Sequence, residues 1–305
     1  MDHLKPGATF EGRLRLYVPA GKGVNTARSL SRLIPTPGSI VSAIWVGRDE
    51  ESWFRTWLKA NHGLETAACP RRCGTRSAYT IMESSGRETH IKESMSAPNA
   101  AEQNELKSFW AGTVQRGDSV SLCGSAPSGT SRKTLAALFK SAHEKGACAI
   151  IADTSGVALD VAAAASLYGI KGNASEIGTW LNVTNFNLQR APHREILKHA
   201  FARRGAPKRI VMTLGGEGAA LATQDKLFFA LPASLTKKQL HSTTGCGDAA
   251  TAGWLWAIQD ECSPEDTLRR IVCCGTAKAT SDDPGDLNAS MVTALLKKTR
   301  VIELV

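Results

Sequence analysis

A glycine-rich loop that leads into a run of helix formers is the stretch of this sequence best suited to chemistry. It reads Ser242-Thr-Thr-Gly-Cys-Gly-Asp248. Such a loop directs backbone N–H groups at one point, and the helix behind it adds its positive dipole end, so the pattern favours anion binding. Asp248 could then accept a proton from a hydroxyl that attacks a phosphoryl group, while the amides of Gly245, Cys246 and Gly247 hold the developing charge. The alternative is a glycine turn with Asp248 as an ordinary helix N-cap.

A dinucleotide site is a different interpretation of the same letters, because Gly245-x-Gly247-x-x-Ala250 fits its glycine spacing. That motif requires a strand just before it and an acidic residue on a following strand about 20 residues later. The preceding residues 235–241 are polar, and a second helix with Ser263 as N-cap follows. We therefore expect no dinucleotide here.

The length of 305 residues allows a sizeable core and suits one large α/β domain or two small ones. The hydrophobic content is 42%, the charged content 21% and the formal net charge +9. No apolar run approaches the ~20 residues of a membrane span. The positive charge is spread without interleaved aromatics, which disfavours a nucleic-acid partner. The eight cysteines show no metal-ligand spacing and the N-terminus is polar, so we expect a cytoplasmic protein that contacts no membrane.

Strand and helix patterns alternate over most of the chain. Such alternation predicts a mostly parallel sheet with helices on both faces and a ligand site at the carboxyl ends of its strands. A hairpin is expected where two polar strands flank Ser84-Ser85-Gly86. The expected strands cover 14–18, 39–47, 75–83, 88–93, 119–123, 147–153, a short segment that ends at Ile170, and 209–214, and the expected helices cover 22–33, 50–60, 131–145, 157–167 and 194–204.

Polar and glycine residues gather where these strands end. One decoy among them has the glycine spacing of a phosphate-binding P-loop, Gly124 to Gly129, but Thr130 stands where the lysine of that motif must be. The remaining candidates also include a glycine-lysine turn before the first helix. They are Gly21, Lys22, Ser125, Asp153, Lys171, Asn173, Glu176, Thr213, Gly215 and Gly218.

Three motifs in order give the chain a family resemblance. They are Gly21-Lys-Gly-x-Asn-x-Ala-Arg28, Asp153-Thr-Ser-Gly-x-Ala-Leu159 and Gly245-x-Gly-Asp248, with Thr75-Arg76 opening a hairpin between the first two. With them the chain resembles the PfkB-type, ribokinase-like carbohydrate kinases over nearly its whole length. The most similar branch contains the 1-phosphofructokinases and tagatose-6-phosphate kinases.

The resemblance implies a single domain over residues 1–305, with a ribokinase-like three-layer α/β/α fold and a small β-lid formed by about 8–19 and 74–94. It implies ATP and Mg²⁺ as cofactors, a sugar phosphate as substrate and a possible homodimer through the lid. The implied roles are a catalytic base at Asp248, an anion hole at Gly245, Cys246 and Gly247, and sugar binding by Gly21, Lys22 and Asn25. The sugar's phosphate would contact Arg76 and Ser125. ATP would contact Lys171, Asn173, Glu176, Thr213, Gly215 and Gly218, and the metal would contact Glu176 through water and also Asp153.

The chain also departs from the family pattern. Ala20 and Gly172 replace a glycine and a proline of the motifs. The family's first strand, which ends in Asn-Pro-x-x-Asp, has no counterpart here, so we expect a gap in the sheet, from either a truncated start or a real loss. A kinase for an unphosphorylated sugar or nucleoside, and a catalytically impaired paralogue that acts in binding or regulation, remain alternatives. Arg76 with Lys22 favours a phosphorylated substrate, and the retained Asp248 favours activity.

Overall fold

A seven-stranded sheet forms the centre of the protein in the computed structural model, which describes residues 5, 7–36 and 38–304. The strand order is β11-β10-β9-β8-β7-β6-β5. The strands from β5 to β8 pair in parallel with their neighbours. The pairs β8–β9, β9–β10 and β10–β11 are antiparallel. The strands are β5 (Ser119–Cys123), β6 (Ala149–Asp153), β7 (Gly169–Asn173), β8 (Ile210–Thr213), β9 (Ala219–Ala222), β10 (Leu227–Ala230) and β11 (Val301–Leu304).

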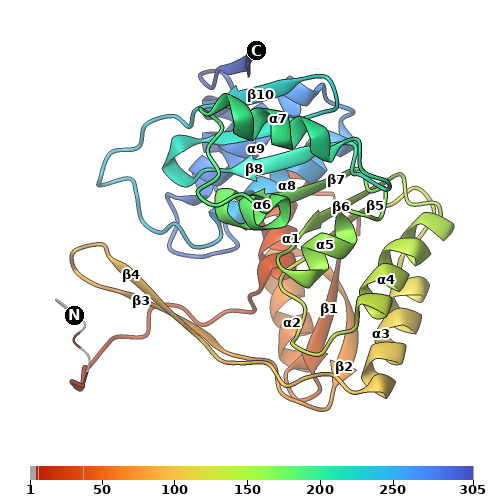
Figure 1. Cartoon of the computed structure of the whole chain (residues 1–305). Coiled ribbons are helices and arrows are strands. Elements are labelled where there is room, and N and C mark those ends of the chain that lie inside the picture. Colours follow the sequence, from red (N-terminus) through yellow and green to blue (C-terminus); the bar gives the residue numbers. More distant parts are fainter. Residues whose placement is uncertain (1–4, 6, 37, 305) are drawn as a thin grey trace.

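Helices cover both faces of this sheet (Figure 1), because successive strand residues point to opposite sides. Ile150 lies in the apolar core beneath one set of helices, and its neighbour Ile151 lies in the core beneath the other. The first set is α4 (Arg132–Glu144), α5 (Val157–Ala162), α6 (Ala174–Leu181) and α7 (Ala191–Ala200). The second includes α8 (Cys246–Gln259) and α9 (Pro264–Lys278), with α1 (Lys22–Leu33) packed on α8 and α10 (Ala289–Leu296) on α9. The predicted three-layer α/β/α architecture is confirmed.

A second, two-stranded parallel sheet joins β1 (Val41–Gly47) to β2 (Glu65–Arg71). The helix α2 (Glu51–His62) connects them, and α3 (Ala100–Thr113) packs beside them. Within the described residues β1 does not pair with β5, so the parallel strands are divided between two sheets. The expected gap in the sheet lies at this division.

The predicted hairpin is present as β3 (Ala78–Met82) and β4 (Glu88–Lys92), and it extends away from the rest of the molecule (Figure 1). The prediction of a strand at Leu14–Val18, which was expected to belong to the same lid, is wrong. These residues have no ladder partner and are mostly exposed, and Tyr17 instead stacks on Trp53 with ring centroids 4.8 Å apart. A short apolar run does not form a strand where no neighbouring strand accepts its hydrogen bonds.

Further bounds also differ from the sequence expectations. The strand expected to end at Ile170 continues to Asn173 as β7, and the helix expected to reach Leu167 ends at Ala162. A turn with Ser166 at φ 52° follows that helix. The helix expected over 194–204 lies earlier in the chain, as α7. In the part of the chain that the structure describes, no helix combines the length and apolar character needed to cross a membrane.

Candidate active site

The glycine-rich loop ends at the N-terminus of α8. Gly245 is the N-cap, with φ +86°, and a Cβ built on it would lie 1.9 Å from the carbonyl oxygen of Pro284. Only glycine fits this backbone conformation and this close approach. Asp248 is the third residue of the helix and makes no capping hydrogen bond. The interpretation of Asp248 as a helix N-cap is therefore wrong.

The first turn of α8 presents unpaired backbone donors. Within the described residues, the amides of Gly245, Gly247 and Asp248 have no protein acceptor, whereas the Cys246 amide donates to the carbonyl of Thr243 over 3.3 Å. Unpaired amides at a helix N-terminus, together with the dipole, form an anion site. Burial raises the pKa of the Cys246 thiol to about 11, so this side chain adds no negative charge near pH 7.

Asp248 is 7% exposed beside these amides. Its Oδ2 accepts a hydrogen bond from Asn25 Nδ2 over 2.8 Å, and Thr26 Oγ1 donates to its backbone carbonyl over 3.2 Å. Burial, and then the negative charge of Asp153, raise the pKa of Asp248 to about 6. The Asn25 Oδ1 atom is buried without a partner in the described structure. A ligand hydroxyl placed here could donate to Asn25 Oδ1 or to the Asp248 carboxylate.

We predict that Asp248→Asn stabilises the protein increasingly as the pH rises. The carboxyl has a higher pKa in the folded chain, about 6, than its ordinary 3.8. The stability due to the bound proton is therefore complete below 3.8 and is lost as the pH rises through 6. At pH 7.5 the Asn variant should unfold with a free energy higher by about 3 kcal/mol, and by clearly less at pH 4.5. Urea denaturation at the two pH values tests this. A pH-independent difference would contradict the environment described for Asp248.

Asp153, at the end of β6, is the centre of a buried charge cluster. It is 1% exposed. Its Oδ1 accepts from Lys22 Nζ at 2.9 Å, and its Oδ2 accepts from Lys171 Nζ at 2.8 Å and from Thr251 Oγ1 at 2.7 Å. Burial alone would raise the pKa of Asp153, but the ammonium groups of Lys171 and Lys22 lower this pKa to about 2. Both oxygens are engaged by protein donors, which suits a positioning role better than the metal contact that the family resemblance implied.

The two lysines bring positive charge to the base of the anion site. A Cβ built on Gly247 would lie 3.6 Å from Lys171 Nζ, so this ammonium lies next to the first turn of α8. Lys22 is the first residue of α1 and its side chain is 34% exposed. Burial would lower the pKa of Lys22, but the adjacent Asp153 raises it above the usual value. Lys22 therefore carries a positive charge at neutral pH.

The proposed nucleotide segment after β7 has a local structural role as well. Asn173 is the N-cap of α6 and accepts from the Glu176 amide over 2.9 Å, while Glu176 Oε2 accepts from the Asn173 amide over 2.8 Å. This capping box fixes the start of α6. It uses one of the two carboxylate oxygens of Glu176. Gly172 allows the approach, because a Cβ there would lie 3.2 Å from Glu176 Cβ.

The other predicted residues follow neighbouring strand ends. Ser125 follows β5, and its hydroxyl lies 3.2 Å from that of Ser155, which follows β6. Thr213 ends β8, and Gly215 and Gly218 have φ of +60° and +106° in the turn to β9. Arg76, just before β3, is exposed. The structure thus brings Lys22, Asn25, Asp153, Lys171 and Asp248 into one hydrogen-bonded and charged group, and shows no contact between that group and Arg76.

Glu88 is a residue of the site that the sequence did not reveal. It begins β4, and its carboxylate accepts from the amide and hydroxyl of Thr243 at 3.2 and 3.1 Å and from the Thr244 hydroxyl at 3.3 Å. Burial alone would raise the pKa of Glu88, but hydrogen bonds from Ser242 and Thr243 keep this pKa below its ordinary value. The hairpin is therefore attached to the glycine-rich loop. No local pattern in the sequence marks this contact between residues 155 positions apart.

Comparisons with known proteins agree with this geometry. The model of the pfkB family carbohydrate kinases matches residues 5–289. This chain belongs to that family. It is 28% identical over 289 residues to the 1-phosphofructokinase of Bacillus subtilis, covering 94% of this chain and 89% of the relative. It is 24% identical over 290 residues to the tagatose-6-phosphate kinase of Staphylococcus epidermidis, covering 93% and 88%.

Solved structures support the fold. The crystal structure of Escherichia coli phosphofructokinase-2 with fructose-6-phosphate superposes with a TM-score of 0.84 at 21% identity, covering 97% of this chain and 93% of that chain. The protein is thus a carbohydrate kinase of the pfkB family with a ribokinase-like fold, and kinases of this family use ATP. Among the described residues, His, Cys, Asp and Glu side chains form no group of three or more that could hold a metal ion.

Proposed function

We propose that this pfkB kinase transfers the γ-phosphoryl group of ATP to a hydroxyl of a ketohexose phosphate, such as fructose 1-phosphate or tagatose 6-phosphate. The observation that carries the proposal is the burial of Asp248, with its pKa near 6, beside the unpaired amides of α8. A general base acts best when its pKa lies near the working pH. The names of the 1-phosphofructokinase and tagatose-6-phosphate kinase relatives support the substrate class.

The proposed chemistry needs no covalent intermediate on the protein. Asn25 orients the Asp248 carboxylate, which accepts the proton of the attacking hydroxyl. The amides of Gly245 and Gly247 and the Lys171 ammonium stabilise charge on the transferred group, which is the main source of catalysis in phosphoryl transfer. Mg²⁺, when bound with ATP, would neutralise phosphate charge, and Glu176 would hold it through water.

Substrate comparison tests the function directly. The wild-type protein with ATP and Mg²⁺ should phosphorylate at least one of fructose 1-phosphate, tagatose 6-phosphate and fructose 6-phosphate. Its kcat/KM for that compound should exceed that for the matching unphosphorylated sugar. Turnover of the free sugar or of a nucleoside with equal or higher kcat/KM would assign the protein to the other substrate class. No turnover of any of them would favour a binding role.

Arg76 is proposed to bind the phosphate that the substrate already carries. Arg76→Ala should raise KM for the sugar phosphate by about 10- to 150-fold, because it removes a charge-assisted bidentate contact worth about 1.5–3 kcal/mol. The KM for ATP should barely change. Arg87→Ala, an exposed arginine in the turn of the same hairpin, serves as the control. Equal increases in both KM values would rule out this role for Arg76.

The β3–β4 hairpin is proposed to act as the lid over the sugar. Glu88 already joins it to the glycine-rich loop. Its outer residues Tyr79 and Ile91 are partners across the ladder and are 53% and 52% exposed. Paired apolar side chains exposed on a projecting hairpin favour contact with a second copy of the lid, so we include a homodimer in the proposal.

A further inference from the structure

Lys278 is a buried cation that the proposed reaction does not use. It is the last residue of α9 and its side chain is 0% exposed. Its neighbours on the helix, Cys274 and Ala277, are also buried. Within the described residues it has no carboxylate within ion-pair distance. Burial lowers the pKa of Lys278 below its ordinary value. Keeping an ammonium group in such surroundings is costly unless oriented dipoles compensate for the lost water.

Two backbone carbonyls provide that compensation. Lys278 Nζ donates to the carbonyl of Ser281 over 2.9 Å and to that of Ser242 over 3.4 Å. Ser242 begins the glycine-rich loop and also receives the thiol hydrogen bond of Cys246 on its carbonyl. Ser281 begins the loop of residues 281–285, which we term the support loop. A single ammonium group therefore joins the glycine-rich loop to the support loop.

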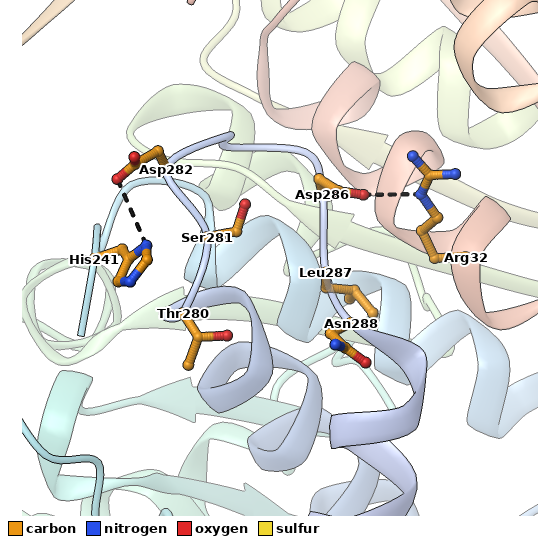
Figure 2. A pocket seen from close by; sticks show the side chains of 8 residues that line it. All are labelled: Arg32, His241, Thr280, Ser281, Asp282, Asp286, Leu287 and Asn288. Atoms are coloured by element: carbon orange, nitrogen blue, oxygen red, sulfur yellow. Dashed lines mark hydrogen bonds and ion pairs between the residues drawn. The ribbon is translucent and has the colours of Figure 1, made fainter. Parts of the chain in front are cut away.

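The support loop lies directly against the anion site. The carbonyl of Pro284 occupies the space that a Cβ at Gly245 would need. Arg28, itself fully buried, holds the loop through Asp283 Oδ2 at 2.5 Å, and Ser29 Oγ donates to the Gly285 carbonyl at 3.1 Å. Figure 2 shows the loop's outer side, where the contact of His241 with Asp282 and the ion pair Arg32–Asp286 lie on either side of Ser281. A change in the position of this loop would move Gly245 and the amides that follow it.

We propose that Lys278 is a positioning residue that acts as an internal cation, joining the glycine-rich loop to the support loop so that the amides of α8 are aligned for phosphoryl transfer. This proposal rests on the proposed kinase function. The contribution of Lys278 should appear in kcat, because the aligned amides stabilise charge that develops only in the transition state. A role in packing alone would not depend on the charge.

Two variants separate charge from packing. Lys278→Ala removes the ammonium and leaves space, whereas Lys278→Met fills most of that space with a neutral side chain. Both should lower kcat by about tenfold or more, the loss expected for hydrogen bonds from a charged donor, with little change in either KM. Ammonium or methylammonium chloride should restore much of the kcat of the Ala variant and little of that of the Met variant. Tetramethylammonium chloride, too large for the site, is the control at equal ionic strength.

Thermal unfolding gives a second measurement that does not need activity. The same ammonium salts should raise the Tm of Lys278→Ala relative to tetramethylammonium and leave the Tm of the wild type and of Lys278→Met unchanged. This result would support the internal cation even if the wild type phosphorylated no sugar phosphate, an outcome that would refute only the proposed function. Wild-type kcat in a folded Lys278→Met variant would overturn the proposal. So would an Ala variant whose kcat and Tm both fail to respond to ammonium ions.

Discussion

Replacing Asp153 by Asn is expected to lower the free energy of unfolding by about 3–5 kcal/mol, the usual effect of removing one partner of a buried ion pair. The carboxylate balances two ammonium groups, Lys22 at 2.9 Å and Lys171 at 2.8 Å. An Asn side chain has nearly the same shape, but it is neutral, and its amide hydrogens would face one of the lysines. The variant therefore leaves two cations close together without the carboxylate to which both are hydrogen-bonded.

The pH dependence of this effect has a definite sign. The pKa of Asp153 in the folded protein is about 2, below its ordinary 3.8. The stability that its charge contributes is therefore present above 3.8 and is lost as the pH falls through 2. Urea denaturation at pH 7.5 tests the prediction. Asp160→Asn is a matched control, since Asp160 makes an exposed ion pair with Arg132 at 3.6 Å, a kind worth about 1 kcal/mol or less. A loss for Asp153→Asn no larger than that of the control would contradict the buried cluster.

Local sequence patterns predicted much of the parallel part of the fold. The strand expected at Ser119–Cys123 has those bounds in the structure, because turn residues mark both of its ends. The antiparallel strands β9 and β10 were not predicted. Each has four residues and is almost wholly buried, so neither shows the alternation of a half-exposed strand. The opposite error was made at Leu14–Val18, where a strand was predicted from a strand-like composition but the residues pair with no neighbouring strand.

The site could be predicted where its residues lie in motifs, and not where they depend on long-range contacts. The glycine-rich loop and Asp248 stand together in the sequence. The Asp153–Lys171 pair depends on the register of β6 and β7, in which these two residues are partners. Glu88 and Lys278 reach the glycine-rich loop only through the folded hairpin and the end of α9. A lysine within the buried face of a helix is a signal that could have identified Lys278.

Asp248→Asn is expected to have the largest effect on turnover. Asn can still accept from Asn25 and keeps the shape of the site, but it cannot take a proton from the attacking hydroxyl. General-base assistance is typically worth about 10²–10⁴-fold in rate. Because the same variant is expected to be more stable at neutral pH, unfolding would not explain a loss of activity. Sugar-phosphate and ATP affinities should stay close to those of the wild type.

The most direct test of the account is therefore kcat for Asp248→Asn at saturating ATP and sugar phosphate, with the ATP dissociation constant measured on the same preparation. The account predicts a loss of at least about a hundredfold in kcat, unchanged ATP affinity and normal turnover in the Asp160→Asn control. Near-wild-type kcat in a folded Asp248→Asn variant would contradict it, because the helix terminus would then bind anions without a base beside it.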